Sequence, residues 1–213
     1  METVSLKGKL LVANPVLPDP NFDRTVVLLL AHQGDGALGL VLNRPSDMDI
    51  DSPLPRWERL AADPSVVFVG GPVAPAAAIC LARVPDGSAR VGAYPEDMED
   101  HEDAEDLEDQ GPGRRQPAAG WVRLVGELGT LDLERDPDEL SVGVDAIRVF
   151  AGYAGWGPGQ LESEIAADAW FVVPAEAADA LSDDPAQLWK RVLRRQRGAL
   201  ALLAAYPPDP SLN

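Results

Sequence analysis

The sequence predicts an α/β fold with α+β character, in which helices pack on a mixed β-sheet. Two observations support this class. Short β-branched apolar runs bounded by glycine and proline turns dominate the first half of the chain, as is typical of hairpins. Strand-like and helix-like stretches alternate in the last third, as is typical of strand–helix units. A chain of 213 residues can bury a substantial core, so we expect a single domain over 1–213.

The first half of the chain reads as a series of strands, over 8–14, 25–32, 38–43, 65–71 and 75–84. The runs 25–32 and 38–43 flank the glycine turn QGDGA and predict a hairpin. The segment GDGALG at this turn also matches G-x-G-x-x-G. Pro45 follows too soon for the helix that a dinucleotide site needs, so we expect no cofactor. The stretch 53–63, with Trp57 on its apolar side, predicts a short helix.

The second half mixes strands and helices. Strand-like patterning covers 121–133, 146–152 and 170–173, and helices are expected from about 137 and over 159–169, 174–181 and 184–206. Asp184 is placed to cap the last helix, with Pro185 at its first position.

The charge of the chain is mostly local. Residues 96–109 hold ten acids and no Lys or Arg, and without them the net charge of −17 falls to −7. This run has no apolar face, so we expect a disordered loop insertion at about 95–119. An acidic chain repels nucleic acid, which is therefore not an expected partner.

The sequence also gives expectations about membrane association, cellular compartment and metal binding. The longest apolar runs are too short to span a bilayer, and there is no segment with the pattern of a secretory signal. With a single cysteine, Cys80, in an apolar run, we expect a cytoplasmic protein with no membrane association. Cys80, His32 and His101 are far apart in sequence, so no metal site is expected.

The segment GYAGWGPGQLESEI at 152–165 lies between a predicted strand and a predicted helix. Helix N-termini bind anions, but here no lysine follows the glycines and Pro158 removes one amide donor. Glu162 and Glu164 in the first turns would also repel an anion. Two interpretations stay open: a tight strand-to-helix turn with Trp156 anchored on the sheet, or a binding site.

Three other features have both a structural and a functional interpretation. His32, at the end of a predicted buried strand, is either a hydrogen-bonded framework residue or a general base. Arg44, which closes the first hairpin, either forms a salt bridge or faces a ligand. The run KRVLRRQR at 190–197 is a solvated basic helix face, a nucleic-acid patch, or a surface screened by the acidic loop.

Taken together, several segments resemble the YqgE/AlgH family of bacterial proteins. They are GKLLVANPVLPDPNFDRTVVLLLAHQGDGALGLVLNRP, GGPV at 70–73, GYAGWGPGQLESEI with Trp170 after it, and the closing LW…DPSLN. The resemblance implies a mixed, partly barrel-like sheet with flanking helices. It implies no established biochemical role, although some members carry a name that suggests transcriptional regulation of polysaccharide synthesis.

The segments that carry the resemblance contain polar residues at strand ends and turns. If these strand ends converge, the loops at 14–24, 43–45, 70–73 and 152–162 would form one cleft. The candidate ligand-binding residues are Thr25, Asn43, Arg44, Trp156, Gln160 and Glu162.

We therefore expect a protein that binds a small ligand or acts as a regulator, with a small molecule or another protein as its partner. One alternative is an enzyme, such as a hydrolase, that uses His32 or Glu162 as general base. A second alternative is a transcriptional regulator, which the net charge and the lack of a helix-turn-helix pattern disfavour.

Overall fold

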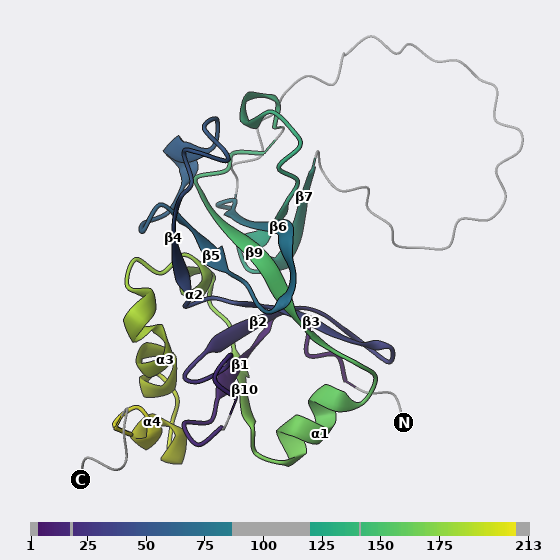
Figure 1. Cartoon of the computed structure of the whole chain (residues 1–213), viewed down its shortest axis with the longest axis vertical. Coiled ribbons are helices and arrows are strands. Elements are labelled where there is room, and N and C mark those ends of the chain that lie inside the picture. The colour runs from purple at the N-terminus through teal and green to yellow at the C-terminus, as the bar shows by residue number, and fades with distance from the viewer. Residues whose placement is uncertain (1–3, 18, 87–119, 141, 208–213) are drawn as a thin grey trace, which may run out of the picture.

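The computed structural model describes residues 4–17, 19–86, 120–140 and 142–207 (Figure 1). The insertion expected at 95–119 lies outside them. The strands are β1 Lys9–Ala13, β2 Val26–Gln33, β3 Gly36–Val41, β4 Pro45–Asp49, β5 Val66–Val69, β6 Val73–Arg83, β7 Trp121–Val125, β8 Leu128–Leu131, β9 Ala146–Trp156 and β10 Trp170–Pro174. The helices are α1 Gln160–Ala166, α2 Ala177–Ala180, α3 Pro185–Arg194 and α4 Ala199–Leu203, with 3-10 turns η1 Glu58–Leu60 and η3 Pro137–Glu139.

The strands form one curled, mixed sheet. Their order is β10-β1-β2-β3-β9-β6-β8-β7, with β5 beside β9 and β4 beside β5. The pairs are antiparallel except β5 with β9, which is parallel. Leu124 and Val125 of β7 pack against the same core as Leu10 of β1, although five strands separate β7 from β1 in the sheet order. The sheet therefore curls into a half-barrel, and the predicted barrel-like α+β architecture is confirmed.

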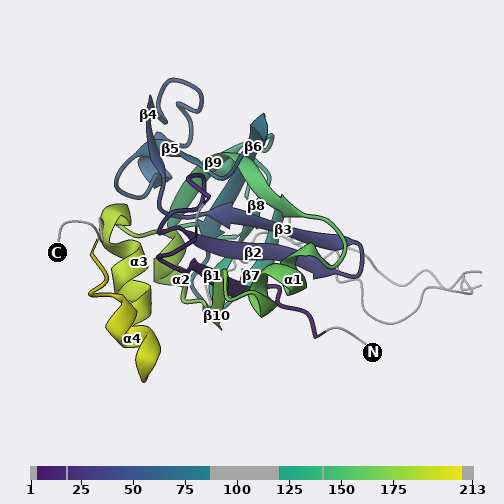
Figure 2. The same cartoon turned by 60° about the horizontal axis from the view of Figure 1, so that its bottom comes forward.

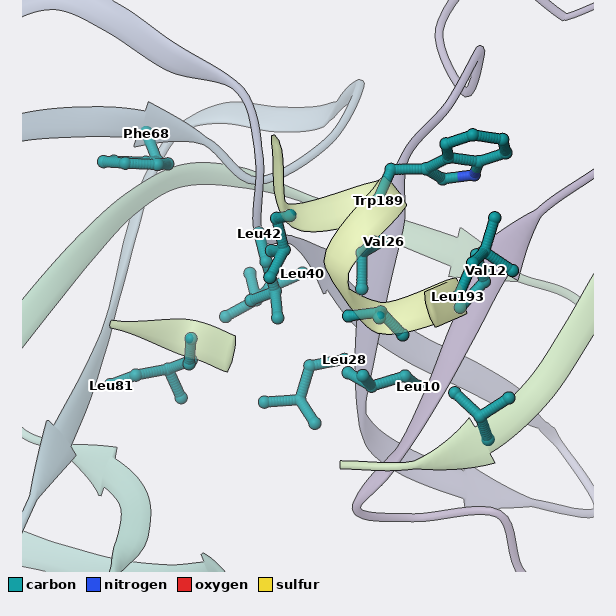
Figure 3. Packing of buried hydrophobic residues seen from close by; sticks show 14 of the residues in the cluster. Leu10, Val12, Val26, Leu28, Leu40, Leu42, Phe68, Leu81, Trp189 and Leu193 are labelled. Atoms are coloured by element: carbon teal, nitrogen blue, oxygen red, sulfur yellow. The ribbon is translucent and has the colours of Figure 1, made fainter. Parts of the chain in front are cut away.

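Helices cover both faces of the sheet where β1 lies. Leu10 and Val12 face a core shared with Leu193 of α3, and Figure 3 shows side chains of β1, β2, β3 and α3 gathered there. Leu11 faces the other side, toward Leu161 of α1. Figure 2 shows α3 and α4 on one side of these strands and α1 on another. A third core, with Trp57 and Cys80, fills the space beside β6, β8 and β9.

Several predicted elements differ from those observed. The prediction of a helix over 53–63 is wrong, because only the 3-10 turn η1 forms there. Pro53 and Pro55 lack amide donors, and each disfavours helical backbone in the residue before it. The helix over 184–206 is interrupted at Gly198 (φ 68°), between α3 and α4. The helices expected near 137 and over 174–181 shrink to η3 and α2, and β4 was not predicted.

Glycines make two close backbone approaches. A Cβ on Gly36 would lie 2.2 Å from the carbonyl oxygen of Trp156, and φ at Gly36 is 135°. Gly36 sits in the β2–β3 hairpin, so GDGALG is a turn with no helix after it, as predicted. Gly152 (φ 71°) lets β9 pass Gly71, whose carbonyl oxygen would lie 2.6 Å from an added Cβ. The strand then continues to Trp156, further than predicted.

Arg148 of β9 is a buried cation that joins distant segments. Its side chain is 2 % exposed and its guanidinium lies 4.2 Å from the ring centre of Phe68. It donates hydrogen bonds to the carbonyl oxygens of Ser182 (2.7 Å), Ala62 (3.2 Å) and Asp63. Burial lowers the pKa of Arg148 to about 10, while the charges of nearby aspartates oppose that shift. Its role is to satisfy carbonyl groups of two loops from inside the core.

We predict that Arg148→Met lowers the free energy of unfolding by about 3 kcal/mol, because it leaves buried carbonyl groups without their donor. The matched control is Arg123→Met. Arg123 also lies over an indole, that of Trp121 at 5.3 Å, but its side chain is 51 % exposed. Its loss should cost under about 1 kcal/mol. Urea denaturation of both variants measures the difference, and equal losses would contradict a structural role for the buried guanidinium.

Candidate functional site

Glu164 of α1 fastens that helix to the sheet. Its Oε2 accepts hydrogen bonds from Nε1 of Trp156 and Nε1 of Trp170, each at 2.8 Å. Its Oε1 accepts one from Nε2 of Gln160 at 2.9 Å. The two indoles meet edge to face with ring centres 6.0 Å apart, and Phe22 packs against both. The GYAGWGPGQLESEI segment therefore has a structural role, because its Trp156 and Glu164 hold α1 against the sheet.

Gln160 is likewise committed to the turn before α1. Its Oε1 accepts a hydrogen bond from the backbone N–H of Gly157 at 3.0 Å, while Nε2 donates to Glu164. Gly159, with φ 71°, takes the left-handed conformation at the N-cap. Trp156 is 6 % exposed. Both candidate side chains therefore spend their polar atoms on local structure.

His32 and Glu162 form a hydrogen-bonded pair between β2 and α1. Nδ1 of His32 accepts the backbone N–H of Leu6 at 3.0 Å, so we infer that its proton sits on Nε2, which donates to Oε1 of Glu162 at 2.9 Å. The His32 side chain is 3 % exposed and that of Glu162 is 42 % exposed. Glu162's own backbone amide and the His32 hydrogen bond hold the pKa of Glu162 below its ordinary value.

This pair joins the N-terminal segment to α1. The hydroxyl of Ser5 also donates to the carbonyl oxygen of His32 at 3.0 Å. Because both ring nitrogens are in use, His32 has no free nitrogen with which to take a proton from a substrate. The geometry is that of a framework histidine, one of the two interpretations that the sequence left open.

The other candidate residues lie beside α3, around a hollow of about 460 Å³ that we call the α3 hollow. It is lined by Asp23, Arg24, Asn43, Arg44, Pro45, Pro185, Ala186, Trp189 and Lys190. The lining comes from the loop before β2, from the segment between β3 and β4 with the first residue of β4, and from the first turns of α3. Asp184 caps α3 by accepting the N–H of Gln187 at 3.2 Å, and Pro185 occupies its start, as predicted.

Asn43 lines the α3 hollow, and Thr25 follows the lining residue Arg24 in the chain. Asn43 is 7 % exposed; its Oδ1 accepts the N–H of Val26 at 3.0 Å and its Nδ2 donates to the carbonyl oxygen of Arg24 at 2.9 Å. The Thr25 hydroxyl donates to the carbonyl oxygen of Phe22 at 2.9 Å and is fully buried. These bonds hold the turn in which Arg24 takes φ 50°, a conformation that non-glycine residues rarely adopt.

Three cations converge on the α3 hollow. The guanidinium of Arg24 lies 4.9 Å from the ring centre of Trp189 and donates to the carbonyl oxygens of Tyr206 (3.1 Å) and Pro207. Arg44 donates through Nη2 to the carbonyl oxygen of Asp23 at 2.5 Å. Among the described residues, neither Arg44 nor Lys190 has an acidic side chain within 4.0 Å, so both charges remain available.

The structure does not bring all six candidate residues into one cleft. Asn43 and Arg44 line the α3 hollow and Thr25 lies beside it, whereas Gln160 and Glu162 lie on α1. Trp156 borders a different hollow of about 480 Å³, formed mainly by β2, β3 and β9. A third hollow of about 280 Å³ lies at η1 and η3.

The described residues offer little else for chemistry. No group of three or more His, Cys, Asp or Glu side chains within them could hold a metal ion. Cys80 is 2 % exposed, and burial raises the pKa of its thiol, which keeps it protonated and unreactive. No helix in the described ranges is long and apolar enough to cross a membrane.

Sequence reasoning missed several contributors to the α3 hollow, among them Arg24, Trp189 and Lys190. Lys190 is predicted only as part of a basic helix face, and Arg24 and Trp189 are not among the candidate residues. The available signal was the segment DPAQLWK, in which the cap, the indole and the lysine fall within two helical turns. Nothing in the sequence places this segment against Arg44.

Comparison with known proteins identifies the family. The profile of the AlgH-like family matches residues 10–201. A UPF0301 protein of Streptomyces coelicolor is 49% identical over 212 residues, covering 100% of this chain and 97% of the relative. A UPF0301 protein of Mycobacterium tuberculosis is 43% identical over 206 residues, covering 97% of this chain and 90% of that relative.

Two solved structures share the fold. The crystal structure of protein DIP2367 from Corynebacterium diphtheriae has a TM-score of 0.76 at 27% identity, covering 97% of this chain and 95% of that one. The solution structure of the AlgH protein from Pseudomonas aeruginosa has a TM-score of 0.59 at 28% identity, covering 97% of each chain. The resemblance noted in the sequence is thus confirmed, and the chain belongs to the AlgH-like family.

Proposed function

We propose that this protein is a cytoplasmic ligand-binding protein that takes a small organic anion, a carboxylate or a phosphate, in the α3 hollow. The observation that carries the proposal is the convergence of Arg24, Arg44 and Lys190, with Asp23 as the one carboxylate among the described residues of the lining. This cationic surface belongs to a chain whose net charge is −17. Positive charges kept together against such a background favour an anionic ligand.

The shape and chemistry of the hollow support an organic anion. A volume of about 460 Å³ suits a small molecule. Pro45, Pro185 and Ala186 provide apolar walls for a carbon skeleton. The hydrogen bond from Nη2 to the Asp23 carbonyl oxygen holds the Arg44 guanidinium in place. The other guanidinium nitrogens can then donate hydrogen bonds to two oxygens of an anion.

The enzyme alternative has weaker support. Among the described residues that line the α3 hollow there is no histidine, cysteine or serine, and only Asp23 and Lys190 could act as a base. His32 and Glu162 lie elsewhere and are bonded to each other. A binding role needs only the groups that the hollow provides.

We predict that benzoate and phenyl phosphate at millimolar concentration raise the melting temperature, since a ligand that binds only the folded state stabilises it. Arg44→Gln and Lys190→Gln should each weaken binding about tenfold by removing a charged hydrogen-bond donor. Calorimetric titration measures the Kd. Arg197→Gln is the matched control, because Arg197 is exposed and lies outside the hollow.

The neutral analogue benzyl alcohol separates charge recognition from apolar contact and should not stabilise the protein. Equal stabilisation of the wild type and the Arg44→Gln/Lys190→Gln double variant would show a general salt effect and reject the α3 hollow as the site.

We predict that Glu162→Gln lowers stability slightly at pH 7 and that this loss shrinks as the pH falls below about 4. The pKa of Glu162 is lowered in the folded state, so its contribution is present above the ordinary glutamate pKa and is lost as the pH falls through the lowered value. Urea denaturation across this pH range measures it. Glu58→Gln, at an exposed glutamate with no ion pair among the described residues, should show no such trend. A loss that does not depend on pH would contradict a role for the Glu162 charge.

A role in DNA binding rests on the exposed basic face of α3 and the residues after it. Arg191, Arg194 and Arg197 are exposed there. We nevertheless predict no measurable binding of a fluorescent duplex at 20 mM salt, because the acidic remainder of the chain opposes a polyanion. Anisotropy measures this, and affinity that falls steeply with added salt would support the regulator instead.

A further inference from the structure

The first half of β6 forms an exposed apolar run. Residues 72–78 read PVAPAAA and all of them are exposed, whereas Cys80–Ala82 in the other half of the strand are buried. Val69 of β5 is 46 % exposed, and the strand register places it in one row with Ala151 of β9 and Ala78 of β6. A run of consecutive exposed apolar residues is unusual in a folded protein unless it contacts a partner. We call residues 72–78 together with Val69 the β6 strip.

An irregularity in the pairing of β6 with β9 explains this exposure. Between the residue pairs that join the two strands, Ala74–Ala77 of β6 lie opposite the single residue Gly152 of β9. Ala74 takes φ 46°, in the left-handed region that residues with a side chain rarely adopt. The segment therefore bulges out of the sheet, and a strained backbone of this kind is typical of functional segments.

The edge of β6 is also open beside the strip. β6 pairs with β8 only over Cys80–Arg83, and no other described strand lies on that side. The N–H of Val84 donates to the carbonyl oxygen of Glu127, just before β8, so the backbone of every second residue back from Val84 faces β8. Ala78 is one of these residues, and β8 ends before it reaches the N–H and carbonyl oxygen of Ala78. An extended chain can therefore pair with β6 at Ala78.

A hollow adjoins the other end of the strip. Val73 borders the hollow of about 480 Å³ at β2, β3 and β9, which we call the hairpin hollow. Its apolar walls include Ala31, Leu38 and Tyr153. Asp35, in the turn of the β2–β3 hairpin, is the one charged residue among the described residues of the lining, and it has no ion pair within the described ranges. Figures 1 and 2 show this hairpin extending away from α3 and α4, so the hairpin hollow is separate from the α3 hollow.

These features define the chemistry of a partner. A large apolar side chain fits the walls of the hairpin hollow, and a neighbouring lysine or arginine complements the carboxylate of Asp35. The net charge of −17 attracts a basic segment more strongly than a neutral one. A second copy of this chain fits less well, because the same surface would bring a second Asp35 and no cation. Pro72 and Pro75 also lack the amide donors that pairing of two β6 edges would use.

We propose that the β6 strip and the hairpin hollow form a docking site for an extended segment of another protein. The segment pairs with β6 at Ala78, places a large apolar side chain in the hairpin hollow beside Val73, and sets a lysine or arginine against Asp35. This site is independent of any anion bound in the α3 hollow.

Selection from a peptide library tests the predicted preference. A library of short random peptides displayed on phage is panned against the immobilised full-length chain and, in parallel, against its Val73→Asp variant. We expect the wild type to enrich peptides that combine a large apolar residue with lysine or arginine, by about tenfold over the variant. Val73 is 38 % exposed, so the variant should keep the melting temperature of the wild type, which circular dichroism checks.

Fluorescence anisotropy with the most enriched peptide, synthesised with a fluorescent label, measures the Kd. Val73→Asp should weaken binding about tenfold, because it places a charge against an apolar side chain. Asp35→Asn should weaken binding about threefold and reduce its dependence on salt. The matched controls are Val16→Asp, at a 65 % exposed valine in the loop before β2, and Asp183→Asn, at an exposed aspartate outside the hollow. Both should leave the Kd unchanged.

A charge swap tests the contact with Asp35 directly. A peptide in which glutamate replaces the basic residue should bind the wild type about tenfold more weakly than the selected peptide. Asp35→Lys should restore binding of this glutamate peptide and weaken binding of the selected one.

Each remaining outcome overturns the docking site. It fails if panning enriches no peptide, if Val73→Asp and Val16→Asp weaken binding equally, or if the charge swap restores no binding. Sedimentation velocity provides the last test: concentration-dependent dimers of the wild type that Val73→Asp dissociates would assign the strip to a second copy of the chain instead.

Discussion

Burial of β1 and β2 on both faces is the constraint on which the rest of the structure depends. In β1, Leu10, Leu11, Val12 and Ala13 are all fully buried, so neither face of β1 is open to solvent over these residues. A single layer cannot cover such a strand, and apolar side chains on each side require their own partner. α1 covers one face and α3 the other. The positions of these two helices then determine which polar side chains are used for structure and which stay available.

The two helices are fastened by different chemistry, and this difference locates the candidate site. α1 is short and is held through two carboxylates: Glu164 accepts hydrogen bonds from two indoles, and Glu162 accepts one from His32. α3 is held mainly by apolar contact, with one hydrogen bond from Trp189 Nε1 to the carbonyl oxygen of Ala13 at 2.9 Å. The carboxylates of Glu162 and Glu164 therefore form structural hydrogen bonds, whereas Lys190 on α3 has no ion-pair partner within the described chain.

Local patterns in the sequence predicted the parts of the fold that local physics determines. The β2–β3 hairpin follows from two apolar runs around a glycine turn, and the start of α3 follows from Asp184 and Pro185. β4 could not be found, because the segment PSDMD is mostly exposed and lacks alternating apolar residues. The shared hydrogen bonding of Trp156 and Trp170 to Glu164 depends on how α1 packs. The meeting of Arg44 with Lys190 likewise depends on tertiary contacts between segments far apart in sequence.

The distribution of charge favours a small anion over a polyanion as the ligand. At physiological ionic strength, charges more than about 8 Å apart are largely screened by salt. A ligand small enough to enter the α3 hollow therefore feels mainly Arg24, Arg44 and Lys190, with Asp23 as the opposing charge. A nucleic acid extends well beyond that distance and meets the acidic remainder of a chain with net charge −17. Salt therefore weakens the repulsion between a small anion in the hollow and the distant acidic residues. A nucleic acid contacts the surface at many places, so some of its phosphates come close to acidic residues and are repelled despite the salt.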